Sequence, residues 1–212
     1  MTTLTIMKAR IAEELRRSDL TTQIAAAINT AIQAYEHERW FFNESRDNTF
    51  QTIVNQSNYG VTEAAFIGLI TKIDYVFIII GDQPFRLKND AMIDIEDVST
   101  NNTFYGQSDS YAWYNRQLYL YPIPNEIWTV RVAAVFETSA PLTDDEVGNF
   151  WMTKAELLIR ARAKYELQLH VLKNREAASD MGSAVTEAWD QLNTRTTRLV
   201  KTAGGRVRAM PF

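Results

Sequence analysis

The chain has 212 residues, of which 46% are hydrophobic, and it carries a formal net charge of −4 at pH 7. This composition suits one domain of good size or two small ones and argues against wholesale disorder. The negative charge argues against a protein that holds phosphates mainly by bulk electrostatics, and the lack of cysteine excludes disulfides, thiolate metal sites and a cysteine nucleophile.

The N-terminal region has the residue spacing of two amphipathic helices. The first apolar stripe consists of Leu4, Met7, Ile11 and Leu15. A second stripe runs from Ile24 to Tyr35, and it leads into the aromatic sequence Trp40-Phe41-Phe42. Because so much aromatic surface must be covered, we expect either the rest of the fold or a neighbouring subunit to pack against it.

After Asn43 the pattern changes to the two-residue alternation of strands. The most apolar stretch, Phe66–Ile80, is typical of a strand that begins at a sheet edge and ends fully buried. One of its faces would hold Leu69, Ile73, Tyr75, Phe77 and Ile79. Lys72 and Asp74 interrupt this stretch, which is too short to cross a bilayer, so we expect a soluble protein without a membrane partner.

Further strands are expected in the second half of this β-rich region. They cover residues 111–115, 117–121 and 128–136. Asn115-Arg116 is a plausible tight turn between the first two, and one or two helical turns are expected at residues 90–98.

Helical spacing returns in the last third of the chain. Thr143 and Glu146 have the spacing of a capping box, which predicts that a helix begins there. An apolar stripe from Trp151 to Leu172 predicts one long helix, and a second stripe from Ala177 to Leu199 predicts a last one.

These patterns together predict an α+β fold. Both chain ends, residues 1–45 and 141–201, are expected to form a helical bundle. Residues 46–140 form a central β-rich insertion, and residues 202–212, which contain the flexible joint Gly204-Gly205, form an extended C-terminal tail.

The sequence offers little to a catalytic interpretation. His37 and His170 are the only histidines, they lie on separate predicted helices, and neither has a neighbour at metal-ligand spacing. No glycine-rich phosphate loop and no serine in a nucleophile turn is present. We therefore expect no catalytic residue, no metal site and no cofactor.

Two groups of basic residues have two competing interpretations. Arg160, Arg162 and Lys164 lie on one helix, and a second group follows near the C-terminus. A solvated helix face with cations near a helix end accounts for most of them. The alternative is an interface with an acidic partner or with passing DNA, and Arg206 and Arg208 favour it because they lie beyond the last helix.

Three segments resemble a known family, the head-to-tail adaptor proteins of short-tailed bacteriophages. The segments are Glu38–Glu44 with its tryptophan, Gly106–Trp113, and Leu118–Pro124 with its Tyr-Pro-x-Pro step. The order of the flanking helices also agrees, so the resemblance spans nearly the whole chain. It implies a structural ring, usually of twelve subunits, that docks under the portal and surrounds the channel through which DNA passes without sequence-specific binding.

The resemblance also implies which surfaces make contacts. A C-terminal extension would grip the portal protein, and we assign Arg206, Val207, Arg208, Met210 and Phe212 to that contact. We assign Trp40, Arg160 and Arg162 to the interface between subunits. Tail or nozzle proteins would bind the same ring, which would be assembled in the host cytoplasm and become part of the virion neck.

Other functions stay open at this point. Another neck or tail-tube component is an alternative within the same class. A DNA-binding regulator is disfavoured by the net charge and by the absence of a short helix-turn-helix unit. A hydrolase or nuclease with an unrecognised site is third.

Overall fold

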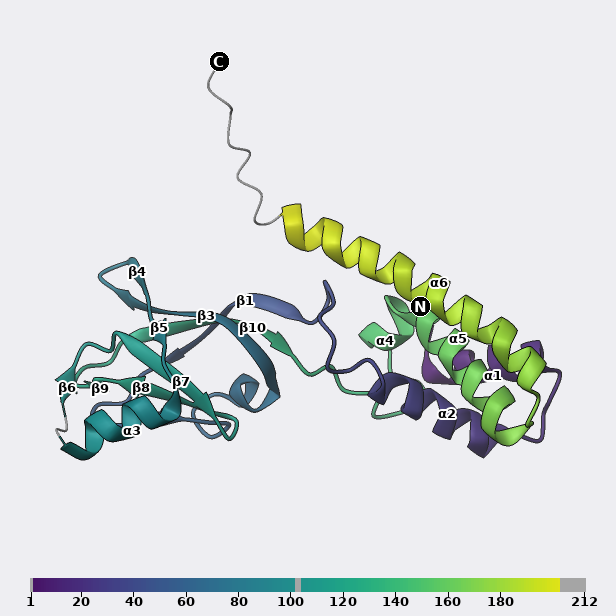
Figure 1. The fold of residues 1–212 in the computed structure, drawn as a ribbon, viewed down its shortest axis with the longest axis horizontal. Coiled ribbons are helices and arrows are strands. Elements are labelled where there is room, and N and C mark those ends of the chain that lie inside the picture. Colours follow the sequence, from purple (N-terminus) through teal and green to yellow (C-terminus); the bar gives the residue numbers. More distant parts are fainter. Residues whose placement is uncertain (1, 102–103, 203–212) are drawn as a thin grey trace, which may run out of the picture. The chain divides into compact units, whose positions relative to one another are not determined.

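The computed structural model describes residues 2–101 and 104–202, which form two compact units. One unit comprises the described residues of Met1–Phe42 and Thr138–Phe212, and the other comprises Asn43–Glu137. The first unit is helical, and the second contains the described strands together with one α-helix (Figure 1).

Helices from both chain ends make up the helical unit. They are α1 (Leu4–Leu15), α2 (Thr21–Gln33), α4 (Phe150–Thr153), α5 (Glu156–Glu166) and α6 (Arg175–Thr202). Helix α5 packs against α1, α2 and α6. The core of this unit combines Met7, Ile28, Trp151 and Leu192, which lie far apart in the chain. Burial of the amphipathic stripes therefore brings the two chain ends into one core.

The start of the C-terminal helices differs from the sequence prediction. The expected capping box at Thr143 and Glu146 is wrong, because α4 begins only at Phe150. Its N-cap is Asn149, whose side-chain oxygen accepts a hydrogen bond from the Trp151 N–H at 3.0 Å. An asparagine at this position satisfies one of the free N–H groups of the first helical turn.

The acidic residues of the segment 141–149 have another role. Glu146 accepts a hydrogen bond from the Leu142 N–H at 2.7 Å. Asp144 pairs with Lys8 at 2.8 Å, and its carbonyl oxygen accepts a hydrogen bond from the Thr5 hydroxyl at 3.1 Å. The contacts of Asp144 connect the segment to the first turns of α1, and no helix begins there.

The single long helix predicted from Trp151 to Leu172 is also wrong. It is interrupted at Lys154 and Ala155, between α4 and α5, and its end winds into a π-helical turn at Leu167–Val171. Trp151 is nevertheless fully buried, and its indole N–H donates to the Thr138 carbonyl at 2.7 Å. The spacing of apolar residues did not reveal the interruption, because the buried side chains before it and after it face the same core.

The β-rich unit contains two four-stranded sheets and one small ribbon. The first sheet has the order β1 (Glu44–Gln51), β10 (Thr129–Phe136), β3 (Ile70–Ile80) and β4 (Gln83–Arg86). The second has the order β2 (Asn58–Tyr59), β8 (Gln117–Tyr121), β7 (Ser110–Tyr114) and β5 (Lys88–Asn89). The ribbon pairs β6 (Tyr105–Gly106) with β9 (Ile123–Pro124), and α3 covers Met92–Asn101.

Several elements of this unit confirm the sequence predictions. Strands β7, β8 and β10 lie within one residue of the expected ranges. The turn between β7 and β8 consists of Asn115 and Arg116, with φ angles of 49° and 57°. Positive φ at both positions is the geometry that joins two antiparallel strands through two residues.

The prediction for Phe66–Ile80 is wrong in two respects. Residues Ala65–Leu69 form a 3-10 turn, so β3 begins only at Ile70. The face that contributes to the core is that of Val76 and Ile78, which are fully buried. A register shift against β10 next to Asp74 puts Ile73 on the core side as well. The strand does not end fully buried, since Ile79 and Ile80 are both partly exposed.

The expected mixture of helices and sheets is therefore confirmed. The core of the β-rich unit lies between the inner faces of its sheets and includes Phe50, Tyr59, Ile78, Leu120 and Val132. Residues 203–212, which hold nearly all of the expected extended tail, lie outside the described residues.

Candidate partner-binding surfaces

The residues predicted to contact partners fall into two groups. Arg206, Val207, Arg208, Met210 and Phe212 lie outside the described residues. The other group, Trp40, Arg160 and Arg162, lies in the helical unit, where their surroundings are defined.

Trp40 is a core residue of its own subunit. Its side chain is 1% exposed, and its indole N–H donates to the Tyr35 carbonyl at 3.1 Å. The ring stacks on Phe42, with 6.4 Å between the ring centroids. The chain itself covers this aromatic turn, and the subunit contact expected at Trp40 stays a prediction.

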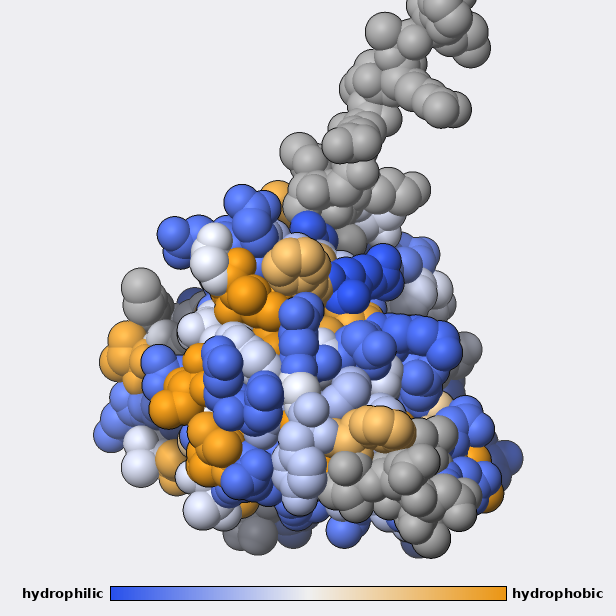
Figure 2. All heavy atoms as spheres, turned by 90° about the vertical axis from the view of Figure 1, so that its left-hand side faces the viewer, coloured by the Kyte–Doolittle hydropathy of each residue, from blue (hydrophilic) through white to orange (hydrophobic). Residues whose placement is uncertain are grey.

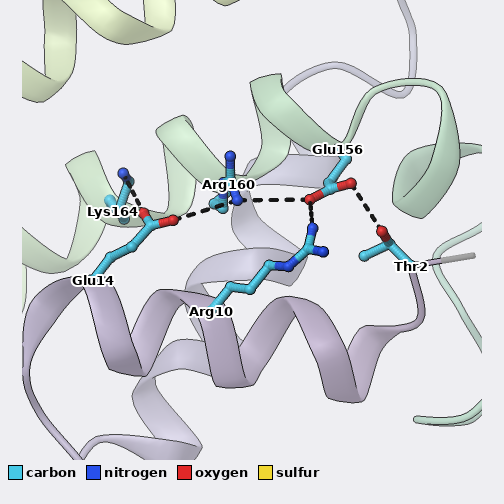
Figure 3. Close-up of polar contacts among 6 residues, drawn as sticks. All are labelled: Thr2, Arg10, Glu14, Glu156, Arg160 and Lys164. Atoms are coloured by element: carbon cyan, nitrogen blue, oxygen red, sulfur yellow. Dashed lines mark hydrogen bonds and ion pairs between the residues drawn. The ribbon is translucent and has the colours of Figure 1, made fainter.

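Arg160 belongs to a network of charged side chains between α1 and α5 (Figure 3). Its guanidinium lies 3.3 Å from the Glu14 carboxylate and 3.7 Å from Glu156. Lys164 contacts Glu14 at 2.6 Å, and Arg10 pairs with Glu156. Figure 3 shows Glu14 of α1 reaching toward two cations of α5, and Glu156 of α5 reaching toward a cation on each helix. The network therefore holds α1 against α5.

Arg162 is neutralised in a similar way. Its guanidinium lies 2.6 Å from the Glu166 carboxylate one turn further along the chain and stacks over the Tyr165 ring. The cations of α5 therefore have intramolecular partners, as expected of a solvated helix face. Such partly exposed pairs each contribute only about 0–1 kcal/mol to stability.

The titratable groups suggest no reaction centre in the part of the chain that is described. His37 and His170 have 73% and 67% exposed side chains, each beside a glutamate. No group of three metal-ligating side chains occurs among the described residues. Burial raises the pKa of Tyr35, Tyr59 and Tyr111, which is the expected effect of packing a phenol into a core.

An unusual surface lies on the outer face of the first sheet, away from the core. Tyr75, Phe77 and Ile79 are half-buried there, because Val76 and Ile78 between them point into the core. The Tyr75 and Phe77 rings meet edge to face, with 5.4 Å between their centroids. Outer faces of antiparallel sheets are ordinarily polar, so three large side chains in a row are notable.

Arginines flank these rings on both neighbouring strands. Phe77 lies opposite Arg131 of β10 on one side and opposite Arg86 of β4 on the other. The Arg131 guanidinium lies 5.1 Å from the Phe77 centroid, and that of Arg86 lies 5.8 Å from the Tyr75 centroid. We call Tyr75, Phe77, Ile79, Arg86 and Arg131 the arginine–aromatic face.

Sequence reasoning missed this face. The alternation in β3 shows two apolar faces, and it does not indicate which one meets the core. Arg86 and Arg131 lie 45 residues apart in the sequence, and only the strand register brings them beside Phe77. Aromatic residues and arginine are enriched at the centres of protein interfaces, so this face is a candidate contact surface.

A second candidate surface lies around the β6–β9 ribbon. Backbone hydrogen bonds connect Asn55 to Pro124 and Ile123 to Phe104. The segments joined in this way carry exposed apolar side chains at Ile53, Val54, Phe104, Tyr105 and Ile127. Figure 2 looks onto this side of the β-rich unit and shows apolar residues among hydrophilic ones.

Comparison with protein families identifies the family of this chain. A family model described as "SU10 adaptor protein" matches residues 1–208. The chain belongs to the SU10 adaptor protein family. A search of curated proteins finds no match. Family membership confirms the resemblance to phage head-to-tail adaptors and supports a structural adaptor role, in which surfaces matter more than a reaction centre. Among the described helices of this adaptor, none is long and apolar enough to cross a membrane.

Proposed function

We propose that this adaptor forms a closed ring beneath the phage portal, joins the capsid to the tail and surrounds the channel through which DNA passes. The observation that carries the proposal is the family match, which covers residues 1–208 of 212. The partners would be the portal protein on one side and tail or nozzle proteins on the other. The ring would be a dodecamer in the virion neck, assembled in the host cytoplasm.

The composition of the described surface agrees with a role in assembly. It offers exposed apolar side chains around the β6–β9 ribbon and the arginine–aromatic face. The three cations of α5 that could have bound DNA are paired with carboxylates of the same chain. We propose residues 1–45 with 141–201 as the body of the adaptor, 46–140 as its insertion, and 202–212 as its tail.

Electron microscopy of the protein mixed with its portal tests the ring directly. We expect the isolated protein to be monomeric or weakly associated and to form a closed ring on the portal, because head-to-tail contacts close rings. A tight twofold dimer in native mass spectrometry, unchanged by adding portal, would rule out this assembly.

The C-terminal residues are proposed to hold the portal. Arg206, Val207 and Arg208 lie within the family match, whereas Met210 and Phe212 lie beyond it. Alternation in an extended segment would place the two arginines on one side, and Met210 and Phe212 are apolar anchors of the kind that fill partner pockets.

Deletion of residues 206–212 should sharply weaken co-sedimentation with portal particles and leave the melting temperature nearly unchanged. Phe212→Ala should reproduce part of the loss. Leu142→Ala is a matched control, because it removes a 91% exposed apolar side chain elsewhere in the chain. Equal portal binding by full-length and truncated protein would contradict this assignment.

A further inference from the structure

The arginine–aromatic face has a specific charge pattern. Arg131, Phe77 and Arg86 form one row across three neighbouring strands, with an aromatic ring between two cations. Because neighbouring strands lie about 4.8 Å apart, the backbones that carry the two arginines are about 10 Å apart. Both guanidinium groups lie over aromatic rings, which orients their planes and leaves their edges available for hydrogen bonds.

A complementary pattern occurs on the solvent side of α6. Its exposed residues include a stripe at alternating steps of three and four, formed by Glu176, Asp180, Ser183, Glu187, Asp190 and Thr194. None of the four carboxylates pairs with a basic side chain among the described residues. The opposite side of the helix packs into the core through Ala188 and Leu192. The stripe therefore runs along the solvent side of the helix, and its four carboxylates can bind basic groups of a partner.

The spacing of the two patterns agrees. Asp180 and Glu187 are seven residues apart, which corresponds to about 10 Å along a helix. Ser183 lies between them and is small. The two acids of the stripe are therefore about as far apart along the helix as the backbones that carry Arg131 and Arg86 are across the sheet.

We propose that the arginine–aromatic face of one subunit docks on the α6 stripe of a second copy of this chain, with Arg131 and Arg86 opposite Asp180 and Glu187. The contact joins two different surfaces, so it is heterologous, and a repeated heterologous contact forms a ring when the rotation between neighbouring subunits closes. This inference rests on the proposed ring and identifies the surfaces that would form it.

A charge-swap experiment tests the contact without requiring the portal. One variant carries Arg86→Glu and Arg131→Glu, and the other carries Asp180→Lys and Glu187→Lys. Sedimentation equilibrium of concentrated protein measures self-association, and each variant alone should associate roughly tenfold more weakly than wild type. An equimolar mixture should recover most of the wild-type association, because Glu on one subunit then meets Lys on the next.

Two controls make the result specific. The Lys88→Glu, Arg116→Glu variant changes the net charge by the same amount at positions outside the face and should associate like wild type. Thermal melts must show that each variant is folded. If a charge reversal unfolds the β-rich unit, Arg86→Gln with Arg131→Gln replaces it and should weaken association in the same direction.

Three outcomes would overturn the inference. Variants that associate as strongly as wild type would show that the proposed contact does not form. Loss without recovery in the mixture would show that the two surfaces do not meet between chains. Loss of duplex DNA binding in the arginine variant, with unchanged self-association, would make the face a DNA surface. Portal binding by the wild type is measured separately, so failure of this contact is distinguishable from failure of the adaptor proposal.

Discussion

Individual residues in the helical unit contribute to its stability through burial or through charged partners. Trp40 and Trp151 are almost fully buried, and each donates its indole N–H to a backbone carbonyl. Such residues combine a large apolar area with a satisfied polar group, which makes them strong contributors to stability. The exposed pair of Arg17 and Asp19 represents the opposite case, in which the effect is local and electrostatic.

Replacing Trp40 by alanine tests its assignment to the core. We expect Trp40→Ala to lower the free energy of unfolding by about 3–5 kcal/mol, because it leaves a large cavity. Urea denaturation followed by circular dichroism measures the change. Leu142→Ala should stay within about 0.5 kcal/mol of wild type, since that side chain is almost fully exposed. A small effect of Trp40→Ala would mean that the aromatic turn is not part of the core.

The pair of Arg17 and Asp19 makes a prediction about pH. A hydrogen bond from Arg17 lowers the pKa of Asp19 from 3.8 to about 2. A lowered pKa in the folded state contributes stability above pH 3.8, and this contribution is lost as the pH falls toward 2. Arg17→Gln should return the pKa of Asp19 toward 3.8, as measured by carbon-13 NMR of the carboxyl group. An unchanged pKa of Asp19 would show that a group other than Arg17 stabilises the Asp19 carboxylate.

At the scale of elements, short polar segments decide where helices begin. The segment before α4 uses Asn149 as its cap, while Thr143 has no comparable role at a helix start. Asn149→Ala should therefore cost about 1 kcal/mol of stability, the usual effect of removing an N-cap side chain. Thr143→Ala should stay within about 0.5 kcal/mol of wild type. Chemical denaturation of both variants measures the two losses of stability. A larger loss for Thr143→Ala than for Asn149→Ala would support the capping box instead.

At the scale of the whole molecule, the described residues form two cores that share no residue. The helical core includes Leu158, and the β-rich core includes Leu120, both almost completely buried. We expect unfolding to show two transitions, because each unit has its own cooperative core. Leu158→Ala should lower one transition and Leu120→Ala the other, each by about 2–5 kcal/mol. Calorimetry distinguishes this result from a single transition that both variants shift.

Assembly belongs to the same scale. The proposed ring needs two different surfaces on each subunit, and the arginine–aromatic face and the α6 stripe are the pair that we propose. Charge complementarity at such surfaces mainly sets specificity and the rate of association. Added salt should therefore weaken the association of wild-type subunits more than that of the Arg86→Gln, Arg131→Gln variant.

The sequence by itself determined the types of element and the family. Apolar spacing located the helices at both ends, the positive-φ turn at Asn115-Arg116 joined two predicted strands, and aromatic motifs indicated the adaptor family. These features depend on residues within a few positions of one another. Only the tertiary structure decided four further features. They are the residue at which α4 begins, the face of β3 that is buried, the residues that cover Trp40 and the residues that pair with Arg160. Glu14 and Arg160 lie 146 positions apart in the sequence, and such pairs are set by how distant segments pack, which local periodicity does not encode.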